Sequence, residues 1–274
     1  MSSKPATLPA YARSALNHCN LPAVILGGLT YQRHPEPIEI DGVQVLHRAL
    51  FGALDRIDDP AVRALHFRDY MSACFLLDHK ERAGFDPDLQ RVRRGRADYL
   101  RLLRGWMFDA DSIEGAVLKR WVESRFGLLT RRHGGPLREM DSAAYHAYQA
   151  DYVRGLYNTN ALEAQLDLLY SYCQYELRRR HGGRLHWTLY RGLNRLQDFE
   201  CMSPPQSERV AVLLNNLNSF SADREQACAF GDTVLAAQVP LPKLLYFHDL
   251  LPGVLKGEQE FLVIGGVYEV LLSY

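Results

Sequence analysis

The spacing of apolar residues divides the chain into two parts of different character. Between about residues 47 and 180, apolar positions recur every three or four residues, as in R-A-D-Y-L-R-L-L-R-G-W-M-F, and this period predicts amphipathic helices. After Gly183 the chain changes to short apolar runs between turn residues, such as T-V-L-A-A-Q-V-P and E-F-L-V-I-G-G-V-Y-E-V, which indicate strands. We therefore predict an α+β protein with a mainly helical region over 1–183 and a strand-rich core over 184–274, packed together as one compact unit.

The strongest helical pattern lies at the end of the first region. We expect a helix over about 160–181 that is capped by Thr159 or Asn160, because Asn160 and Glu163 resemble a capping box. Its predicted apolar face consists of Leu162, Leu166, Leu169, Cys173 and Leu177.

Near the N-terminus, a short segment has a different pattern. In I-E-I-D-G-V-Q-V-L, apolar and polar residues alternate around Asp41-Gly42, a dipeptide that favours tight turns. We therefore expect a short hairpin there.

The aromatic residues of R-L-L-R-G-W-M-F admit two interpretations. Trp106 and Phe108 could form a docking surface for a partner. Large aromatic side chains are more often part of a core, so we expect core positions for both.

Composition and charge exclude several classes of protein. Lys and Arg together number 32, as do Asp and Glu, so the formal net charge is zero, and we expect no nucleic-acid partner and no binding to membrane surfaces. No window approaches eighteen uncharged apolar residues and the N-terminus lacks the apolar core of a signal peptide, so we expect no membrane span and no export. Five scattered cysteines without a C-x-x-C pair favour a reducing, cytoplasmic location over a disulfide framework.

Common catalytic motifs are missing from the sequence. There is no G-x-G-x-x-G after a strand, no P-loop, no H-E-x-x-H and no G-x-S-x-G. The ten histidines are dispersed without i, i+4 pairs, so surface or core positions are favoured and we expect no metal site.

Two carboxylates raise a question near the C-terminus. Glu258 and Glu260 bracket one residue where an apolar strand begins. Side chains alternate faces along a strand, so both would point the same way, roughly 7 Å apart. Such a like-charged pair faces either open water or a substrate that develops positive charge.

Polar residues also mark the ends of other predicted strands. Arg191 follows L-H-W-T-L-Y, Ser219 and Ser221 end V-A-V-L-L-N-N-L-N-S-F-S, and Glu260 begins E-F-L-V. Each feature alone is common on protein surfaces, but together and in this order they resemble the Arg-Ser-Glu signature of the mono-ADP-ribosyltransferases. The segment G-E-Q-E-F-L-V-I-G-G-V-Y-E-V is similar to the E-x-E-x-L strand of that family, and we expect a turn and a partner strand after it.

The resemblance implies a fold and a reaction. The fold would be that of a mono-ADP-ribosyltransferase, with two small sheets packed at an angle around an NAD cleft. NAD would be the substrate, and its nicotinamide–ribose bond would break through an oxocarbenium-like transition state. Glu260 would stabilise the positive charge that develops near the ribose and would accept a hydrogen bond from the ribose 2′-OH.

The resemblance also implies roles for four other residues. Ser219 would hold the Glu260 carboxylate, and Arg191 would anchor the phosphate and ribose of NAD through its planar fork of donors. The backbone of Gly192 would approach the nicotinamide amide, because no Cβ stands in the way. Phe230 would stack on nicotinamide as an aromatic does in some relatives; a core position is the alternative for it.

Glu258 indicates the acceptor. In this family, glutamate two positions before the catalytic glutamate is found in enzymes that modify arginine. A guanidinium is no nucleophile while protonated, so a nearby carboxylate must orient it and take its proton. The resemblance thus favours an arginine acceptor, with the preceding segment H-D-L-L-P-G-V-L-K-G facing the target.

Segments of the N-terminal half indicate one particular family among the mono-ADP-ribosyltransferases. H-C-N-L-P-A-V-I-L-G-G-L-T-Y-Q-R-H-P and V-L-K-R-W-V-E-S-R-F-G-L-L resemble the dinitrogenase reductase ADP-ribosyltransferases of nitrogen-fixing bacteria, and the likeness extends over nearly the whole chain. It implies that an arginine of dinitrogenase reductase is modified and nitrogen fixation switched off, and that the PII nitrogen-signalling protein is an activator. Two alternatives stay open: a transferase or NAD glycohydrolase with another target, and a non-catalytic binding module.

Overall fold

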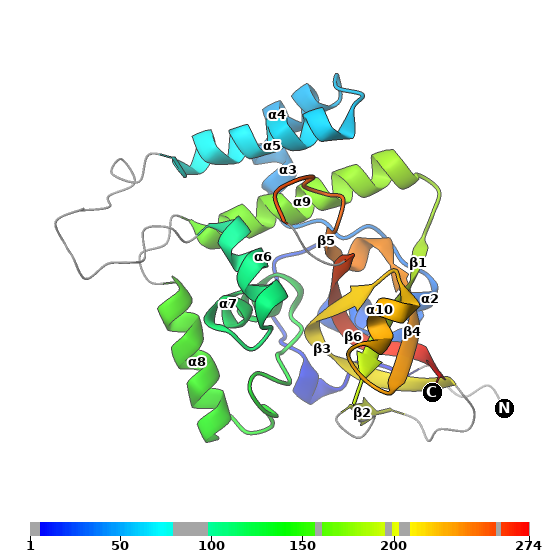
Figure 1. The fold of residues 1–274 in the computed structure, drawn as a ribbon. Helices are drawn as coiled ribbons and strands as arrows, with labels where there is room; N and C mark the ends of the chain where they lie inside the picture. The colour runs from blue at the N-terminus through cyan, green and yellow to red at the C-terminus, as the bar shows by residue number, and fades with distance from the viewer. Residues whose placement is uncertain are drawn as a thin grey trace.

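A computed structural model describes residues 6–78, 98–156, 161–194, 199–202, 209–255 and 259–273. In it, helices form most of the first region and strands form most of the second (Figure 1). The predicted α+β class is therefore confirmed. A single cluster of buried apolar side chains extends through both regions, from Leu8 to Leu272.

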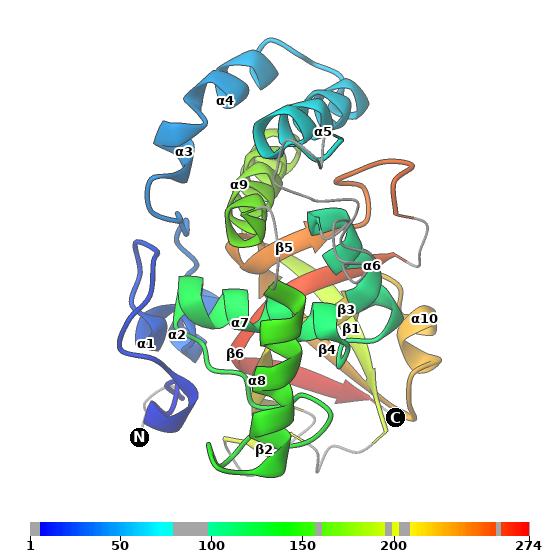
Figure 2. The same ribbon diagram turned by 90° about the vertical axis from the view of Figure 1, so that its left-hand side faces the viewer.

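One long, largely buried helix of the first region lies between other helices and the sheet. α9 (Leu162–His181) packs against α5 (Pro60–Phe75) on one side and strand β5 (Leu244–Phe247) on the other (Figure 2). α6 (Tyr99–Phe108), α7 (Ile113–Phe126) and α8 (Ala143–Leu156) follow one another in contact, and α7 reaches the sheet at β3. The remaining helices are shorter: η1 (Ala10–Ala12), α1 (Ala23–Leu26), α2 (Leu29–Arg33), α3 (Val43–Leu46), α4 (Arg48–Leu54), α10 (Arg224–Cys228) and η3 (Leu241–Lys243).

Side-chain caps set where three of the longer helices begin. Asp59 accepts a hydrogen bond from the Ala61 N–H ahead of α5, Asp98 caps α6, and Ser112 caps α7. Each cap satisfies a backbone donor that the first helical turn leaves free. α7 ends at Gly127, whose φ of 68° is left-handed and suits glycine.

The long helix matches its predicted face but not its predicted cap. Its five apolar face residues are all buried, as expected. The N-cap is Ala161, at a left-handed φ of 48°, with no side-chain capping bond; Thr159 and Asn160 lie outside the described residues. Our capping-box prediction for Asn160 and Glu163 is therefore wrong, because the helix starts one residue later than that box requires.

The hairpin expected at Asp41-Gly42 is also wrong. Gly42 has a φ of 77° and precedes α3, so the chain turns there into a helix and not into a second strand. Ile38, Ile40 and Val43 are buried while Val45 is exposed. The alternating pattern therefore reflects an extended segment followed by a single helical turn.

Six strands form one antiparallel sheet. They are ordered β2-β3-β1-β4-β6-β5, and β3 additionally pairs with β6. The two separate sheets that we expected are therefore joined. The reason is length, because β3 and β6 exceed the other strands and pair with different neighbours along their course. The strands are β1 (His186–Leu193), β2 (Glu200–Cys201), β3 (Arg209–Ser221), β4 (Thr233–Pro240), β5 (Leu244–Phe247) and β6 (Glu260–Ser273).

The C-terminal strand is continuous, so the turn and partner strand that we expected after the E-x-E-x-L segment are wrong. β6 passes through Gly265 and Gly266 without reversing, and Gly266 takes a φ of 118° opposite a register shift between Leu214 and Leu217 of β3. The glycine pair thus marks a bulge in the sheet. A Cβ on Gly265 would lie 1.6 Å from the Asn215 carbonyl oxygen, which explains the need for glycine at this crossing.

Strand pairing brings the predicted polar residues together. Tyr190 of β1 lies opposite Ser221 of β3, and Ser221 lies opposite Glu260 of β6. The ends of these three strands therefore meet at one edge. Among the described residues, no helix is both long enough and apolar enough to cross a membrane.

Candidate active site

Ser219 holds the three signature residues together. Its hydroxyl donates a short hydrogen bond to Oε1 of Glu260. Its backbone carbonyl oxygen accepts a hydrogen bond of 2.8 Å from Nη1 of Arg191. Residues from β1, β3 and β6 thus form one connected site.

A fourth residue, from the helical region, joins this group. The indole Nε1 of Trp106, near the end of α6, donates to Oγ of Ser219 at 2.8 Å. Trp106 is buried, as we expected, whereas Phe108 is 94% exposed, so the core position predicted for Phe108 is wrong. The sequence pattern gave no sign that Trp106 contacts the site.

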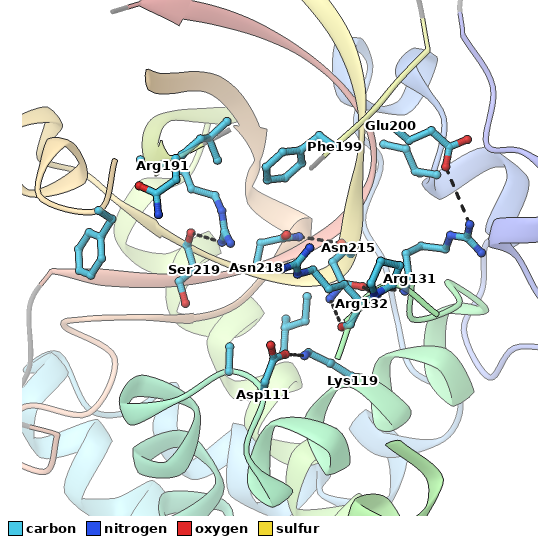
Figure 3. Close-up of a pocket in the computed structure, with 18 of the residues that line it drawn as sticks. Asp111, Lys119, Arg131, Arg132, Arg191, Phe199, Glu200, Asn215, Asn218 and Ser219 are labelled. Carbon is cyan, nitrogen blue, oxygen red and sulfur yellow. Dashed lines mark hydrogen bonds and ion pairs between the residues drawn. The ribbon is translucent and has the colours of Figure 1, made fainter. Parts of the chain in front are cut away.

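Two cavities border this group. Both have Trp106, Ala110, Arg191, Gly192, Ser219 and Phe230 in their walls. The first, here called the Glu260 cavity, has a volume of about 360 Å³, and Glu260, Tyr190 and Phe108 contribute to its lining. The second, the basic cavity, has a volume of about 410 Å³ and contains Lys119 and several arginines (Figure 3). Both volumes lie in the range of small-molecule sites, and the two cavities differ in the chemistry of their walls.

The basic cavity takes most of its positive charge from segments that precede the sheet in sequence. Five cationic side chains line it, against two acids, Asp111 and Glu200. Nε of Arg191 and Nε of Arg131 are buried without a hydrogen-bond partner among the described residues. Burial lowers the pKa of the Arg191 guanidinium, and the charge of Glu260 opposes this effect. Unpartnered cationic donors of this kind favour an anionic ligand. The five cationic residues are Lys119, Arg131, Arg132, Arg138 and Arg191.

Asparagines at the β3 bulge place these cations. Oδ1 of Asn215 accepts from the backbone N–H of Arg131 at 2.8 Å and of Arg132 at 3.3 Å. Nδ2 of Asn216 donates to the carbonyl oxygen of Lys119 at 2.7 Å, which ties α7 to the sheet. The unusual run N-N-L-N inside an apolar strand was the one available sequence signal for this arrangement.

Lys119 lies in a buried polar network. Its Nζ is 2.7 Å from Oδ1 of Asp111 and 3.2 Å from Nδ1 of His133. Burial lowers the pKa of Lys119, and the charge of Asp111 opposes that shift. Burial raises the pKa of Asp111, but the charge and hydrogen bond of Lys119 outweigh it, so the pKa of Asp111 lies below its usual value. The network keeps Lys119 fixed at the cavity wall.

The other predicted site residues have different outcomes. Gly192 lines both cavities, but a Cβ there would lie 2.0 Å from the Ala227 carbonyl oxygen, so the packing of α10 already demands glycine. Phe230 is 60% exposed beside the cavities, so the alternative of a core position is excluded. Glu258 lies outside the described residues, and its role stays a prediction.

Comparisons with known proteins agree with one another. The family model described as dinitrogenase reductase ADP-ribosyltransferase (DRAT) matches residues 16–272. The NAD(+)--dinitrogen-reductase ADP-D-ribosyltransferase of Rhodospirillum rubrum is 40% identical over 260 residues, which cover 94% of each chain. No solved structure matches the chain.

Proposed function

The chain belongs to the dinitrogenase reductase ADP-ribosyltransferase family, and from this membership we propose that it transfers ADP-ribose from NAD to an arginine of dinitrogenase reductase. The modification inactivates that protein and switches off nitrogen fixation. One observation carries the proposal: Ser219 binds both Arg191 and Glu260, so the three signature residues form a single site between two cavities. The antiparallel sheet with this site at its strand ends also supports a mono-ADP-ribosyltransferase fold.

The two cavities suit the two ends of NAD. The diphosphate and adenosine occupy the basic cavity, where Lys119, Arg132 and Arg191 supply positive charge. The nicotinamide and its ribose occupy the Glu260 cavity, where Phe230 offers an exposed ring for stacking. Arg191 borders both cavities, so its guanidinium faces the phosphate and ribose between them.

Bond cleavage then depends on Glu260. As the C1′–N bond breaks, nicotinamide leaves with the bonding electrons and positive charge develops on the ribose ring. A carboxylate fixed beside that ring stabilises the charge in the transition state more than in the ground state. The Ser219 hydroxyl fixes the carboxylate because it donates to Oε1 of Glu260.

An acceptor nitrogen completes the transfer. A guanidine nitrogen of the target arginine forms a bond to C1′ and loses a proton, which we assign to Glu258 as general base. The segment from His248 to Leu255 lies between β5 and this glutamate along the chain, so we propose that it faces the target. The attached ADP-ribose is bulky and doubly negative, and would obstruct the docking face of dinitrogenase reductase.

Two further parts of the proposal concern regulation and location. The PII protein implied as activator would bind the helical half, where Val45, Leu46 and Leu65 are exposed on α3 and α5. A cytoplasmic location suits five cysteines that are all free thiols.

The decisive experiment supplies the purified protein with labelled NAD and reduced dinitrogenase reductase. Mass spectrometry should find ADP-ribose on one arginine of the target. A parallel reaction with a small guanidine separates the alternatives: a transferase for another target labels the guanidine only, a glycohydrolase releases nicotinamide without labelling, and a binding module does neither. The reactions are run both with and without PII. Any of these three results, obtained under both conditions, would overturn the proposal.

A further inference from the structure

We infer that Trp106 is a positioning residue for Glu260 and acts through the Ser219 hydroxyl, so that the helical half completes the catalytic centre. The inference rests on the proposed function, because it concerns the carboxylate to which that function assigns charge stabilisation. Trp106 lies on α6, and Ser219 lies 113 residues later on β3. The contact is therefore made only when α6 is docked against the sheet.

The chemistry of the three groups fixes the direction of the hydrogen bonds. An indole N–H is a donor only, an ionised carboxylate is an acceptor only, and a serine hydroxyl has one donor and two acceptor sites. Trp106 therefore donates to Ser219, and Ser219 donates to Glu260. A hydroxyl that accepts one hydrogen bond becomes a stronger donor of another, so the indole strengthens the bond that holds the carboxylate.

Helices around α6 hold the indole in place. The backbone N–H of Tyr99 donates to Oε1 of Gln165, a buried residue of α9, at 3.0 Å. On the side of α7, a Cβ on Gly105 would lie 2.5 Å from Cβ of Glu114, so the two helices meet closely beside Trp106. Trp106 itself is 3% exposed, which leaves little freedom for its ring. The donor is thus preorganised and not merely within reach.

A second tryptophan of the protein can test whether the Trp106–Ser219 hydrogen bond has only a structural role. Trp121 is also buried, also in the helical region, and its Nε1 donates to Oδ1 of Asp167 at 2.7 Å. It lines neither the Glu260 cavity nor the basic cavity. If Trp106 serves only to satisfy a buried N–H, the two tryptophans should respond alike to loss of that group.

The experiment replaces each tryptophan by phenylalanine and measures nicotinamide release from NAD. Trp106→Phe should lower the turnover number about tenfold, the equivalent of one lost hydrogen bond, while KM for NAD stays within about twofold. Trp121→Phe should keep turnover within about twofold. Because Trp106 acts through Ser219, adding Trp106→Phe to Ser219→Ala should cause no further loss.

Three results would overturn the inference: unchanged turnover in Trp106→Phe, an equal loss in Trp121→Phe, or an additive loss in the double variant. Thermal unfolding checks that each variant folds. If Trp106→Phe does not, site-specific 3-benzothienylalanine at position 106 removes only the donor and keeps the ring volume, and the same outcomes apply. Wild-type protein that releases no nicotinamide, even with PII added, would instead refute the proposed function.

Discussion

Nη1 of Arg191 lies 2.8 Å from the backbone carbonyl oxygen of Ser219 and donates a hydrogen bond to it. One arm of the guanidinium is thereby fixed to β3, while Nε is buried without a partner among the described residues. The planar guanidinium can donate to the strand from one nitrogen and to a ligand from its other nitrogens. A lysine ammonium has only one nitrogen and cannot bridge the strand and a ligand in this way.

Arg191→Lys should therefore weaken NAD binding although it keeps the charge. We expect the dissociation constant for NAD to rise about 10- to 100-fold, because a charge-assisted pair is lost. Calorimetric titration with NAD measures it directly. Arg33→Lys is the control, since Arg33 makes a half-exposed bond to Glu269 at 3.3 Å, away from the cavities. Equal affinities of Arg191→Lys and wild type would contradict this role.

Substitutions of Glu260 and of Glu258 should affect different steps of the reaction. Glu260→Gln should lower both nicotinamide release and transfer to arginine by roughly 100-fold or more, because the electrostatic stabilisation of the ribose is lost. Glu258→Gln should spare nicotinamide release and abolish transfer, because only the acceptor needs a base. Both are measured with a small guanidine as acceptor. A Glu258→Gln variant that modifies the guanidine at the wild-type rate would show that its assigned role is wrong.

Sequence alone could locate part of this site and not the rest. Arg191, Ser219 and Glu260 each end or begin a predicted strand, so a local pattern finds them, and strand pairing then brings them together. Trp106 and Lys119 contact β3 from helices about a hundred residues earlier. No local period encodes such contacts, because they depend on how the helices dock.

The errors of prediction have local physical causes as well. The turn expected after the E-x-E-x-L segment is wrong because Gly265-Gly266 lets β6 cross the Asn215 carbonyl closely and continue; glycines inside a strand often mark such a close approach of the backbone. The predicted capping box is wrong because the N-cap is Ala161, in a left-handed conformation. That conformation cannot be predicted from an alanine in the sequence. At Gly265 the deciding contact comes from a neighbouring strand, which the local sequence pattern does not encode.

Gly192→Ala tests the explanation given for that glycine. The added Cβ would lie 2.0 Å from the Ala227 carbonyl oxygen, so α10 must move. We expect a loss of about 1–3 kcal/mol in the free energy of unfolding, measured by urea denaturation. Gly52→Ala is the matched control: nothing lies within 4 Å of its Cβ in α4, and helix propensity predicts a gain of up to about 1 kcal/mol. Equal stabilities of the two variants would refute the packing argument.

The buried ion pair between α5 and α9 gives a second stability prediction. Nε and Nη2 of Arg63 donate to the two carboxylate oxygens of Glu176 at 2.6 and 2.9 Å, and these bonds raise the pKa of Arg63. Glu176→Gln should lower the free energy of unfolding by about 3–5 kcal/mol, because it leaves a buried charge unpaired. Glu114→Gln, which breaks the half-exposed pair with Arg101, should cost less than about 1 kcal/mol. Urea denaturation measures the free energy of unfolding of both variants. Comparable decreases in the two variants would contradict the prediction.

Lys243 should make stability depend on pH. Its Nζ is buried against the Gly265 carbonyl oxygen at 2.5 Å, and burial lowers its pKa to about 7, whereas an unfolded lysine titrates near 10.4. Below pH 7 both states carry the proton and this contribution is constant. Between about pH 7 and pH 10 the unfolded chain binds one proton more, so the contribution of Lys243 to stability rises with pH, by at most about 1.4 kcal/mol per unit.

The Lys243→Met variant isolates this contribution from the other titrating groups. Methionine keeps most of the apolar stem and cannot titrate, and groups common to both proteins cancel when their free energies of unfolding are subtracted. From pH 7 to pH 9, wild type should gain roughly 2 kcal/mol relative to the variant, and between pH 5 and pH 6 the difference should stay constant. Urea denaturation at these four pH values measures the effect. Parallel curves from pH 7 to pH 9 would mean that Lys243 keeps its proton in the folded state, held by the Gly265 carbonyl and the rings of Tyr31 and Tyr268 at 5.7 and 5.0 Å.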